Sequence, residues 1–381
     1  MLVSDSFVSL AKKIIYFALF QAAIFGALFA LFARTGEFDS INSVVRRMQK
    51  EVILYGPKFT NRAHQLKVQG AATVRPEILA IGSSRMNQWR SAMFHPYRFF
   101  NGANTINMQR DYRRFIEDIG YPKPKVVIFS LDYFTLDDKW DAQYRGQTYD
   151  DDMRFASGLF LKALRGVMDD ALDSPRSIIV GQEPIYSTPA LGLYATRMGN
   201  GFRGDGSYQY GSFISKYKGG SVWYPDDCNC QDRIKFGRGP FVFGDELSKD
   251  RLRELEDFAA YAKTEGIILI GVTSPFHPSV VETLERSTRH SSWRIFNSRT
   301  MSDWFKSRGI IYFNFSRIEA FGGRPDEFVD YFHPSEPAYI RMFLAMLKDP
   351  KVRNIFSDIS ISSLESRLLI STSLEAYRND F

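Results

Sequence analysis

Short apolar runs constrain what this chain can fold into more than any other feature. They are rich in Ile, Val and Phe, and none alternates clearly between polar and apolar residues. This pattern is typical of strands that are buried on both faces of a parallel sheet. The four strongest runs are Ile78–Ile81, Val126–Leu131, Ile267–Val272 and Ile310–Phe315, with Tyr97–Asn101 as a weaker fifth candidate.

Helical patterns lie between these runs. Ser248–Lys263 carries one apolar stripe, with Ser248 as a candidate N-cap and Gly266 as a candidate terminator. Ser335–Leu347 is expected to form a closing helix, with Pro337 in its first turn. Strands that alternate with helices at this spacing predict a doubly wound, flavodoxin-like α/β fold around a parallel sheet.

The N-terminal region contains a segment suited to a membrane. Ile14–Phe32 has 19 residues without a charge, which as a helix would reach about 28 Å, close to the thickness of a bilayer's hydrocarbon core. We interpret it as a transmembrane anchor. A cleaved signal peptide is the alternative, but the segment is long and no Ala-x-Ala site follows it. Lys12 and Lys13 favour a cytoplasmic N-terminus, although Arg46 and Arg47 dilute that bias.

We therefore expect residues 38–381 to lie outside the cytoplasmic membrane, in the periplasm or extracellular space; an enzyme that faces the cytoplasm is the alternative. The predicted organisation is a cytoplasmic tip and anchor (1–34), a membrane-proximal linker (35–76) with a helix around Ile41–Leu54, an α/β domain (77–349) with an insertion at 133–245, and a C-terminal tail (350–381) with amphipathic helix potential. Within the insertion, Cys228 and Cys230 form either a local disulfide or two free thiols.

Composition narrows the classes of function. The formal charge of +6 is spread over 49 basic and 43 acidic residues, and without a dense Lys/Arg run nucleic acid is a poor candidate for a partner. The five histidines and two cysteines are scattered, so we expect neither a catalytic metal centre nor a cofactor.

Two short motifs carry the chemistry. Gly82-Ser83-Ser84 follows the first predicted strand, and Asp330 and His333 follow the last. In a parallel sheet both loops leave the same edge, so a serine, a base and a carboxylate that orients the base can meet there. The alternative is that Ser83, Ser84 or Asp330 merely caps the helix that follows it.

With these motifs the chain resembles the SGNH (GDSL-like) hydrolase superfamily. It looks closest to membrane-anchored members that act on cell-envelope polymers, such as the D-alanyl-lipoteichoic acid biosynthesis protein and the alginate O-acetylation proteins. The resemblance implies that Ser84 is the nucleophile, with His333 as base and Asp330 as its orienting carboxylate. It also implies O-acyl transfer or removal on an extracytoplasmic polysaccharide, with a membrane-bound O-acyltransferase as a partner.

The resemblance further implies an oxyanion hole formed by a glycine, an asparagine and the nucleophile's own N–H. Gly102 is the candidate for the glycine, with Asn104 also in play, but Asp132 stands where the asparagine is expected. A carboxylate there would repel a developing oxyanion. Arg85 is a candidate contact for substrate or oxyanion, and His277, after the fourth strand, for substrate contact or as a replacement base.

The sequence does not separate transferase from esterase, since both pass through the same acyl-enzyme. Aromatic residues between Tyr133 and Phe243 are candidate platforms for sugar rings, or core. The alternative function, which Asp132 favours, is a non-catalytic glycan-binding or assembly component that keeps the fold.

Overall fold

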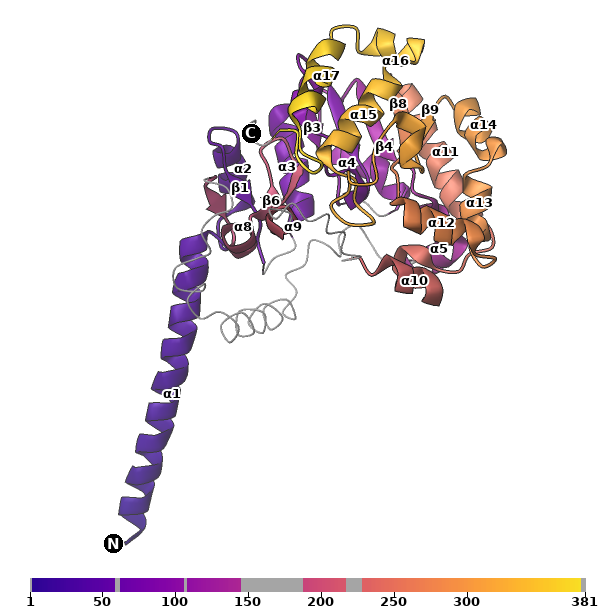
Figure 1. Ribbon diagram of the computed structural model, residues 1–381. Coiled ribbons are helices and arrows are strands. Elements are labelled where there is room, and N and C mark those ends of the chain that lie inside the picture. Colours follow the sequence, from indigo (N-terminus) through magenta and orange to yellow (C-terminus); the bar gives the residue numbers. More distant parts are fainter. Residues whose placement is uncertain (1, 59–61, 106–107, 145–187, 217–227, 378–381) are drawn as a thin grey trace.

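A five-stranded parallel sheet forms the centre of the protein, as seen in the computed structural model, which describes residues 2–58, 62–105, 108–144, 188–216 and 228–377 (Figure 1). Its strand order is β3-β2-β4-β8-β9, which is the flavodoxin-like order for five successive strands. The order reverses beside β2, and ligands of such sheets bind at the carboxyl ends of the strands next to that reversal. The bounds are β2 Ile78–Ile81, β3 Phe99–Asn101, β4 Val126–Ser130, β8 Ile268–Thr273 and β9 Ile311–Asn314.

Helices cover both faces of this sheet. Successive side chains of each strand point to opposite faces, and because these side chains are apolar, both faces must be shielded from water. Leu79 and Ile81 join one apolar cluster, whereas Ile78 and Ala80 join the other. The first cluster is completed by α3 (Ala63–Val74), α4 (Arg110–Asp118), α11 (Lys249–Thr264), α12 (Pro278–Arg286), α13 (Ser291–Phe296) and α14 (Arg299–Ser307); the second by η1 (Ser84–Met86), η2 (Ser91–Phe94), α15 (Glu336–Met346), α16 (Pro350–Ile355) and α17 (Ile361–Ile370).

The predicted mixed α/β class with a parallel sheet is confirmed, and each strand lies within three residues of its predicted bounds. Around α11 the predicted caps are also present. The Ser248 hydroxyl accepts a hydrogen bond from the Arg251 N–H at 3.4 Å. Gly266 has a φ of +70°, the left-handed conformation that ends a helix.

A second, smaller sheet was not predicted. Its order is β5-β1-β6-β7, with bounds β1 Leu54–Tyr55, β5 Ala190–Leu191, β6 Asn200–Phe202 and β7 Tyr208–Tyr210. The helix that was expected around Ile41–Leu54 is α2, which spans only Ile41–Met48. Leu54 belongs instead to β1, which pairs with β5 and β6. The predicted linker region therefore contains β1 and α3 (Ala63–Val74) in addition to the helix that was expected there.

The remaining described elements lie in the segments between and after the strands of the two sheets. They are η3 (Tyr133–Leu136), α5 (Asp138–Tyr144), α8 (Leu193–Met198), α9 (Gly211–Lys216), α10 (Cys230–Phe236), η5 (Gly239–Phe241) and η6 (Ile318–Phe321). Cys228 and Cys230 form a disulfide. Residues 145–187 and 217–227 of the predicted insertion lie outside the described residues.

The C-terminal tail belongs to the same core as the domain, so residue 349 does not separate two units. Val352, Phe356 and Leu364 are buried in the second apolar cluster. The N–H groups of Ala376 and Tyr377 both donate to a carboxylate oxygen of Glu336, each at 2.9 Å.

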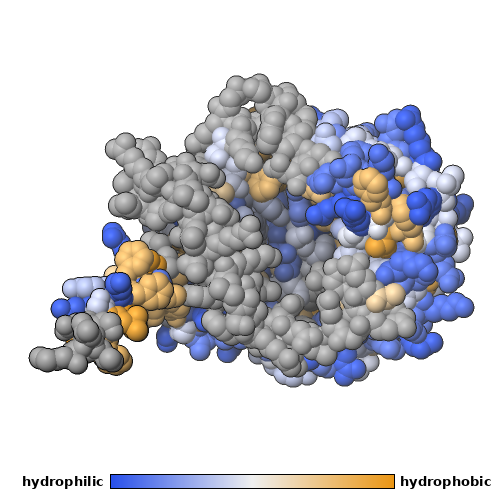
Figure 2. Space-filling model, turned by 90° about the horizontal axis from the view of Figure 1, so that it is seen from below, coloured by the Kyte–Doolittle hydropathy of each residue, from blue (hydrophilic) through white to orange (hydrophobic). Residues whose placement is uncertain are grey.

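One N-terminal helix, α1 (Leu2–Thr35), projects away from the domain (Figure 1). Within it, Phe7–Thr35 is long and apolar enough to cross a membrane, and its most apolar stretch is not buried against the rest of the chain. Seen from below, apolar side chains gather on this helix, whereas the described surface of the domain is mostly hydrophilic (Figure 2).

Candidate functional site

Ser84 and His333 meet at the carboxyl edge of the sheet. Ser84 begins η1 directly after β2, and its Oγ lies 2.9 Å from His333 Nε2 although the two residues are 249 positions apart. The His333 side chain keeps 19% of its surface exposed, so a reactant can approach the pair from solvent. The sequence-predicted nucleophile and base are thus brought together.

Asp330 completes the arrangement from the other side of the imidazole. His333 Nδ1 lies 2.9 Å from Asp330 Oδ2 and 3.0 Å from Oδ1. An ionised carboxylate only accepts hydrogen bonds, so Nδ1 carries the proton and Nε2 is left to accept the Ser84 hydroxyl proton. This is the tautomer that a general base needs.

The carboxylate is held in its ionised form. Burial alone would raise the pKa of Asp330, but His333 and the backbone N–H groups of Phe332 and His333 together lower it below its ordinary value. Those two N–H groups donate to Asp330 Oδ1 at 2.8 and 2.6 Å. Asp330 therefore orients His333 and does not cap α15, whose N-cap is Ser335.

The two neighbouring serines have different roles. Ser83 is the N-cap of η1, and its hydroxyl accepts a hydrogen bond from the Arg85 N–H at 3.3 Å, so the cap alternative applies to Ser83 and leaves the Ser84 hydroxyl facing the imidazole. Gly82 makes the turn possible. Its φ is +133°, and a Cβ there would lie 2.1 Å from Ser130 Oγ.

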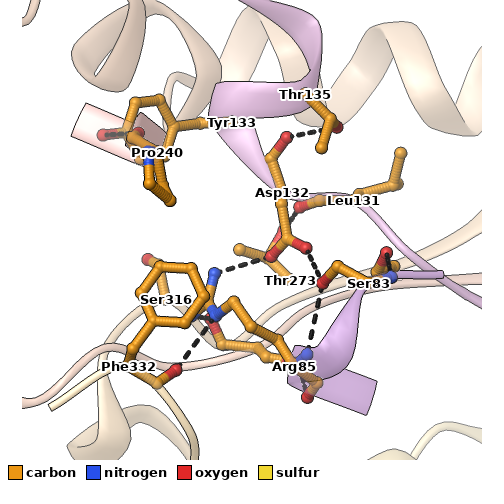
Figure 3. Close-up of polar contacts among 12 residues, drawn as sticks. Ser83, Arg85, Leu131, Asp132, Tyr133, Thr135, Pro240, Thr273, Ser316 and Phe332 are labelled. Atoms are coloured by element: carbon orange, nitrogen blue, oxygen red, sulfur yellow. Dashed lines mark hydrogen bonds and ion pairs between the residues drawn. The ribbon is translucent and has the colours of Figure 1, made fainter. Parts of the chain in front are cut away.

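The Arg85 side chain points toward Asp132 and Phe332 (Figure 3). Its side chain is fully buried. Nη1 donates to Asp132 Oδ1 at 2.6 Å, while Nη2 donates to the carbonyl oxygens of Ser274 and Pro275 at 2.6 and 2.7 Å. Nε donates to the carbonyl oxygen of Phe332 at 3.3 Å. These contacts satisfy the guanidinium, so Arg85 does not serve as the predicted contact for substrate or oxyanion.

The contacts of Arg85 join four loops at one edge of the sheet. Asp132 follows β4, Ser274 follows β8, and Phe332 precedes His333 in the loop after β9, whereas Arg85 itself follows β2. The guanidinium also lies over the Phe276 ring, 3.7 Å from its centre, a cation–π contact that adds to the packing. Arg85 therefore holds the loop of Ser84 in place relative to the loop of His333.

Asp132 is the counter-ion of Arg85 and does not face an oxyanion. Its side chain has no exposed surface, and its second oxygen accepts a hydrogen bond from the Ser83 hydroxyl at 2.7 Å. Both carboxylate oxygens are thus engaged, one by Arg85 and the other by Ser83, and the buried guanidinium offsets the negative charge. The repulsion predicted from its place after the third strand does not arise.

Of the two candidates after β3, Asn104 is available and Gly102 is not. The Gly102 N–H donates to the Ala80 carbonyl oxygen at 2.7 Å, and a Cβ at Gly102 would lie 2.8 Å from the Phe115 ring, so this glycine serves backbone pairing and close packing. Asn104 has a left-handed φ of +71°, and its N–H donates to the Gly82 carbonyl oxygen at 2.9 Å. Its exposed side chain makes no hydrogen bond within the described part of the chain.

Backbone geometry supplies a further donor. The Ser84 N–H is the first of η1 and has no intrahelical acceptor, as is general at helix N-termini. The Asn104 backbone is tied to the Gly82 carbonyl oxygen, two residues before Ser84, so the Ser84 N–H and the Asn104 side-chain amide are the candidate donors to a group bound at the Ser84 hydroxyl.

Sequence reasoning missed Tyr210, which packs against the imidazole. Its ring lies 5.6 Å from the His333 ring, and its hydroxyl accepts a hydrogen bond from Asn87 Nδ2 at 3.2 Å. Burial raises the pKa of Tyr210 far above the ordinary value, so the phenol stays neutral. The turn Asp205-Gly206-Ser207 between aromatic residues was the available signal for the hairpin that brings Tyr210 here.

That hairpin is seated by a buried lysine. Lys67 Nζ donates to the Asn101 carbonyl oxygen at 2.9 Å and to the carbonyl oxygen of Gly206. Burial lowers the pKa of Lys67 to about 7. The small sheet is thereby joined to the edge strand β3 of the large sheet.

The structure places His277 at the N-terminus of α12, where its side chain caps the helix. Its Nδ1 accepts a hydrogen bond from the Ser279 N–H as the N-cap of α12, and its ring stacks on Tyr331 at 4.2 Å. In the part of the chain that the structure describes, no group of three or more His, Cys, Asp or Glu side chains is arranged to hold a metal ion.

The arrangement as a whole contains a hydroxyl, a base in the acceptor tautomer, a carboxylate and hydrogen-bond donors on one exposed edge. Such a set can activate a hydroxyl for attack on an acyl carbonyl. Comparisons with protein families, with curated proteins and with solved structures found no match to this chain.

Proposed function

We propose that this protein is a membrane-anchored serine O-acyltransferase or esterase of the SGNH type that works through an acyl-enzyme at Ser84. The observation that carries the proposal is the continuous chain of hydrogen bonds from Ser84 Oγ through His333 to Asp330, with separations of 2.9 and 2.9 Å. Both distances are within hydrogen-bond reach, the geometric requirement for a nucleophile, its base and its orienting group.

In the first half of the reaction, Ser84 Oγ attacks the carbonyl carbon of an acyl ester while His333 Nε2 takes the hydroxyl proton. The Ser84 N–H and the Asn104 amide stabilise the negative charge on the former carbonyl oxygen. The bond to the leaving alcohol then breaks, and His333 returns the proton to that alcohol. Asp330 stabilises the imidazolium between these two steps.

In the second half, water or a sugar hydroxyl attacks the acyl-enzyme. His333 takes its proton and returns it to Ser84 Oγ as the ester bond to the serine breaks. The products are a free acid in the first case and a new sugar ester in the second. The resemblance to cell-envelope members favours an acetyl group and an extracytoplasmic polysaccharide, with a membrane-bound O-acyltransferase as the acyl donor's carrier.

The position of the anchor supports delivery from the membrane. The helices that follow the carboxyl ends of β4 and β8, α5 and α12, lie on the lower side of the sheet in Figure 1, the side toward which α1 extends. With Lys12 and Lys13 on the cytoplasmic side, the domain lies in the periplasm or extracellular space. The Cys228–Cys230 disulfide agrees with an oxidising compartment.

The alternative, a non-catalytic glycan-binding or assembly component, was favoured by Asp132. The ion pair between Asp132 and Arg85 removes that reason. It remains the outcome to which a failed labelling experiment would point.

The proposal is tested with a fluorophosphonate probe, which forms a bond with an activated serine oxygen and releases fluoride. The full chain in mild detergent is compared with Ser84→Ala and with Ser83→Ala as the matched control. We expect Ser84→Ala to abolish labelling, while Ser83→Ala slows it and keeps it detectable. A folded wild-type protein that is not labelled would refute the acyl-enzyme mechanism.

A further inference from the structure

A cavity lies near the junction of the domain and α1, and its lining does not include Ser84. Its volume is about 640 Å³, and its walls come from the segment that follows α1, from α2, from the first half of α3 and from α4. This volume is within the range of about 300–1,000 Å³ that small-molecule sites occupy. None of the residues of the proposed catalytic site lines it.

One wall of the cavity is continuous with α1. Phe38 lines the cavity, and its ring stacks on Phe29 at 5.1 Å and packs on Phe32 at 6.2 Å between ring centres. Both partners belong to the last two turns of α1. If α1 crosses the membrane, Phe38, three residues beyond the end of the helix, lies close to the lipid headgroups.

The other walls combine positive charge with unused amide groups. Arg62 has no acidic partner among the described residues, and its Nη1 donates only to the Asp39 carbonyl oxygen, at 2.9 Å. Arg114 contributes a second guanidinium, with Asp118 at 3.9 Å as a partly exposed partner. With two arginines and one aspartate in the lining, the net formal charge of these three side chains is positive.

The amides add hydrogen-bonding capacity that the protein does not use itself. The side chains of Asn42 and Gln65 line the cavity and bond to nothing else in the described segments. Gln69 Oε1 is buried there without a hydrogen-bond donor, which is costly unless a bound group supplies one. Ile41 and Val68 provide the apolar part of the lining.

We propose that this cavity binds the headgroup of an anionic phospholipid, with phosphatidylglycerol as the best fit. Arg62 and Arg114 would contact the phosphodiester, since guanidinium groups match phosphate oxygens in geometry and charge. The glycerol hydroxyls would donate to Gln69 Oε1 and bond with Asn42 and Gln65. Phe38 and Ile41 would contact the first carbons of the acyl chains beside α1. The inference depends on membrane insertion of α1 and not on the chemistry at Ser84.

The test is native mass spectrometry of the full chain released from detergent after incubation with phosphatidylglycerol or phosphatidylcholine. We expect one tightly held phosphatidylglycerol on the wild type and much weaker retention of phosphatidylcholine. The double variant Arg62→Gln/Arg114→Gln should bind phosphatidylglycerol about tenfold more weakly or worse, because two charged donors are lost. Arg113→Gln on the same helix is the matched control, since Arg113 pairs with Glu117 outside the cavity.

Several outcomes would overturn the proposal. Equal retention of the two lipids, or unchanged binding in the double variant, would mean that lipid associates only around α1. Displacement of the lipid by inorganic phosphate would identify a soluble anion as the ligand, and displacement by a neutral oligosaccharide would identify a glycan site. Ser84→Ala should hold lipid as the wild type does, so a failure of the acyl-enzyme mechanism and a failure of the lipid site can be told apart.

Discussion

The substitution Asp132→Asn should be among the most destabilising single changes of a polar residue in this protein. It keeps the size of the side chain and an oxygen that can accept from Ser83, but it removes the charge opposite Arg85. The guanidinium is then left fully buried, with only carbonyl oxygens as acceptors. Burial already lowers the pKa of Arg85, and Asp132 is the largest influence that opposes this.

The size of this loss in stability depends on the burial of the Arg85–Asp132 ion pair. Two charges about 4 Å apart attract by about 4 kcal/mol at an effective dielectric constant of about 20, and removal of one partner of a buried pair typically costs about 3–5 kcal/mol. The three carbonyl contacts of Arg85 remain, so we expect a loss near 3 kcal/mol in the free energy of unfolding.

The matched control is Glu117→Gln. Arg113 and Glu117 are separated by 2.8 Å, close to the 2.6 Å of Arg85 and Asp132, but their side chains are 58% and 43% exposed. Exposed pairs of this spacing contribute only about 0.3–0.5 kcal/mol. The comparison therefore holds the contact distance nearly constant and changes the burial.

The assay is urea unfolding of the full chain in mild detergent, followed by tryptophan fluorescence and circular dichroism, with equal m values in all variants. A difference of less than 1 kcal/mol between Asp132→Asn and Glu117→Gln would contradict the view that burial makes the Arg85 pair important. It would also remove the argument that Arg85 fixes the nucleophile loop relative to the loop of His333.

Two further predictions concern the oxyanion donors and the dependence on pH. Asn104→Ala should slow fluorophosphonate labelling about 10²–10³-fold, the usual loss for one oxyanion donor, and should lower the free energy of unfolding by only about 1–2 kcal/mol, because alanine tolerates the left-handed φ of +71° less well than asparagine; labelling at the wild-type rate would assign the donor role elsewhere. Burial alone would raise the pKa of Asp205, but Arg90, Ser207, Ser91 and Arg203 lower it to about 2 from 3.8. The folded protein thus binds this proton less readily, so the ionised carboxylate stabilises it above pH 4 and the benefit is lost as the pH falls from about 3.8 to about 2. The stability difference between wild type and Asp205→Asn, measured by urea unfolding, should shrink over that window; a constant difference would refute the reasoning.

The sequence was sufficient to predict the central sheet because strands buried on both faces carry a distinctive pattern. Each predicted run, such as Val126–Leu131, is long enough to be recognised without knowledge of its partners. The strands of the small sheet are too short for this. Leu54–Tyr55 and Ala190–Leu191 have two residues each, so no period can be read from them, and their pairing joins segments far apart in the chain.

The candidate site was predictable in its members but not in its internal contacts. Ser84, Asp330 and His333 follow from the rule that loops after parallel strands meet at one edge. Arg85 was interpreted as a candidate contact for substrate or oxyanion, whereas its side chain is fully buried. Its partner Asp132 lies 47 residues away, and the signal for the pair was that opposite charges follow two neighbouring strands, β2 and β4. Asp132 was considered only in the position where the resemblance expects an oxyanion-hole asparagine, so an ion pair with Arg85 was not predicted.

The junction between α1 and the domain bears on how an acyl donor would reach Ser84. Glu37, almost fully buried, accepts hydrogen bonds from the Lys58 and Leu193 N–H groups at 2.8 and 2.5 Å, and the Gly192 N–H donates to the Thr35 carbonyl oxygen at 2.6 Å. Two separate segments of the domain therefore hold the end of the helix. These contacts fix the orientation of the domain relative to α1, whereas a flexible linker would allow the domain to rotate freely.

That constraint links the two proposals. With α1 in a membrane, the carboxyl edge of the sheet lies on the membrane side of the domain, and a headgroup in the cavity beside Phe38 would add a second point of attachment to the bilayer. A donor that arrives across the membrane would then meet Ser84 at a short and restricted distance, without release into bulk water. Under the proposed mechanism such confinement would raise the effective concentration of the donor at Ser84, whether the acyl group then passes to a sugar hydroxyl or to water.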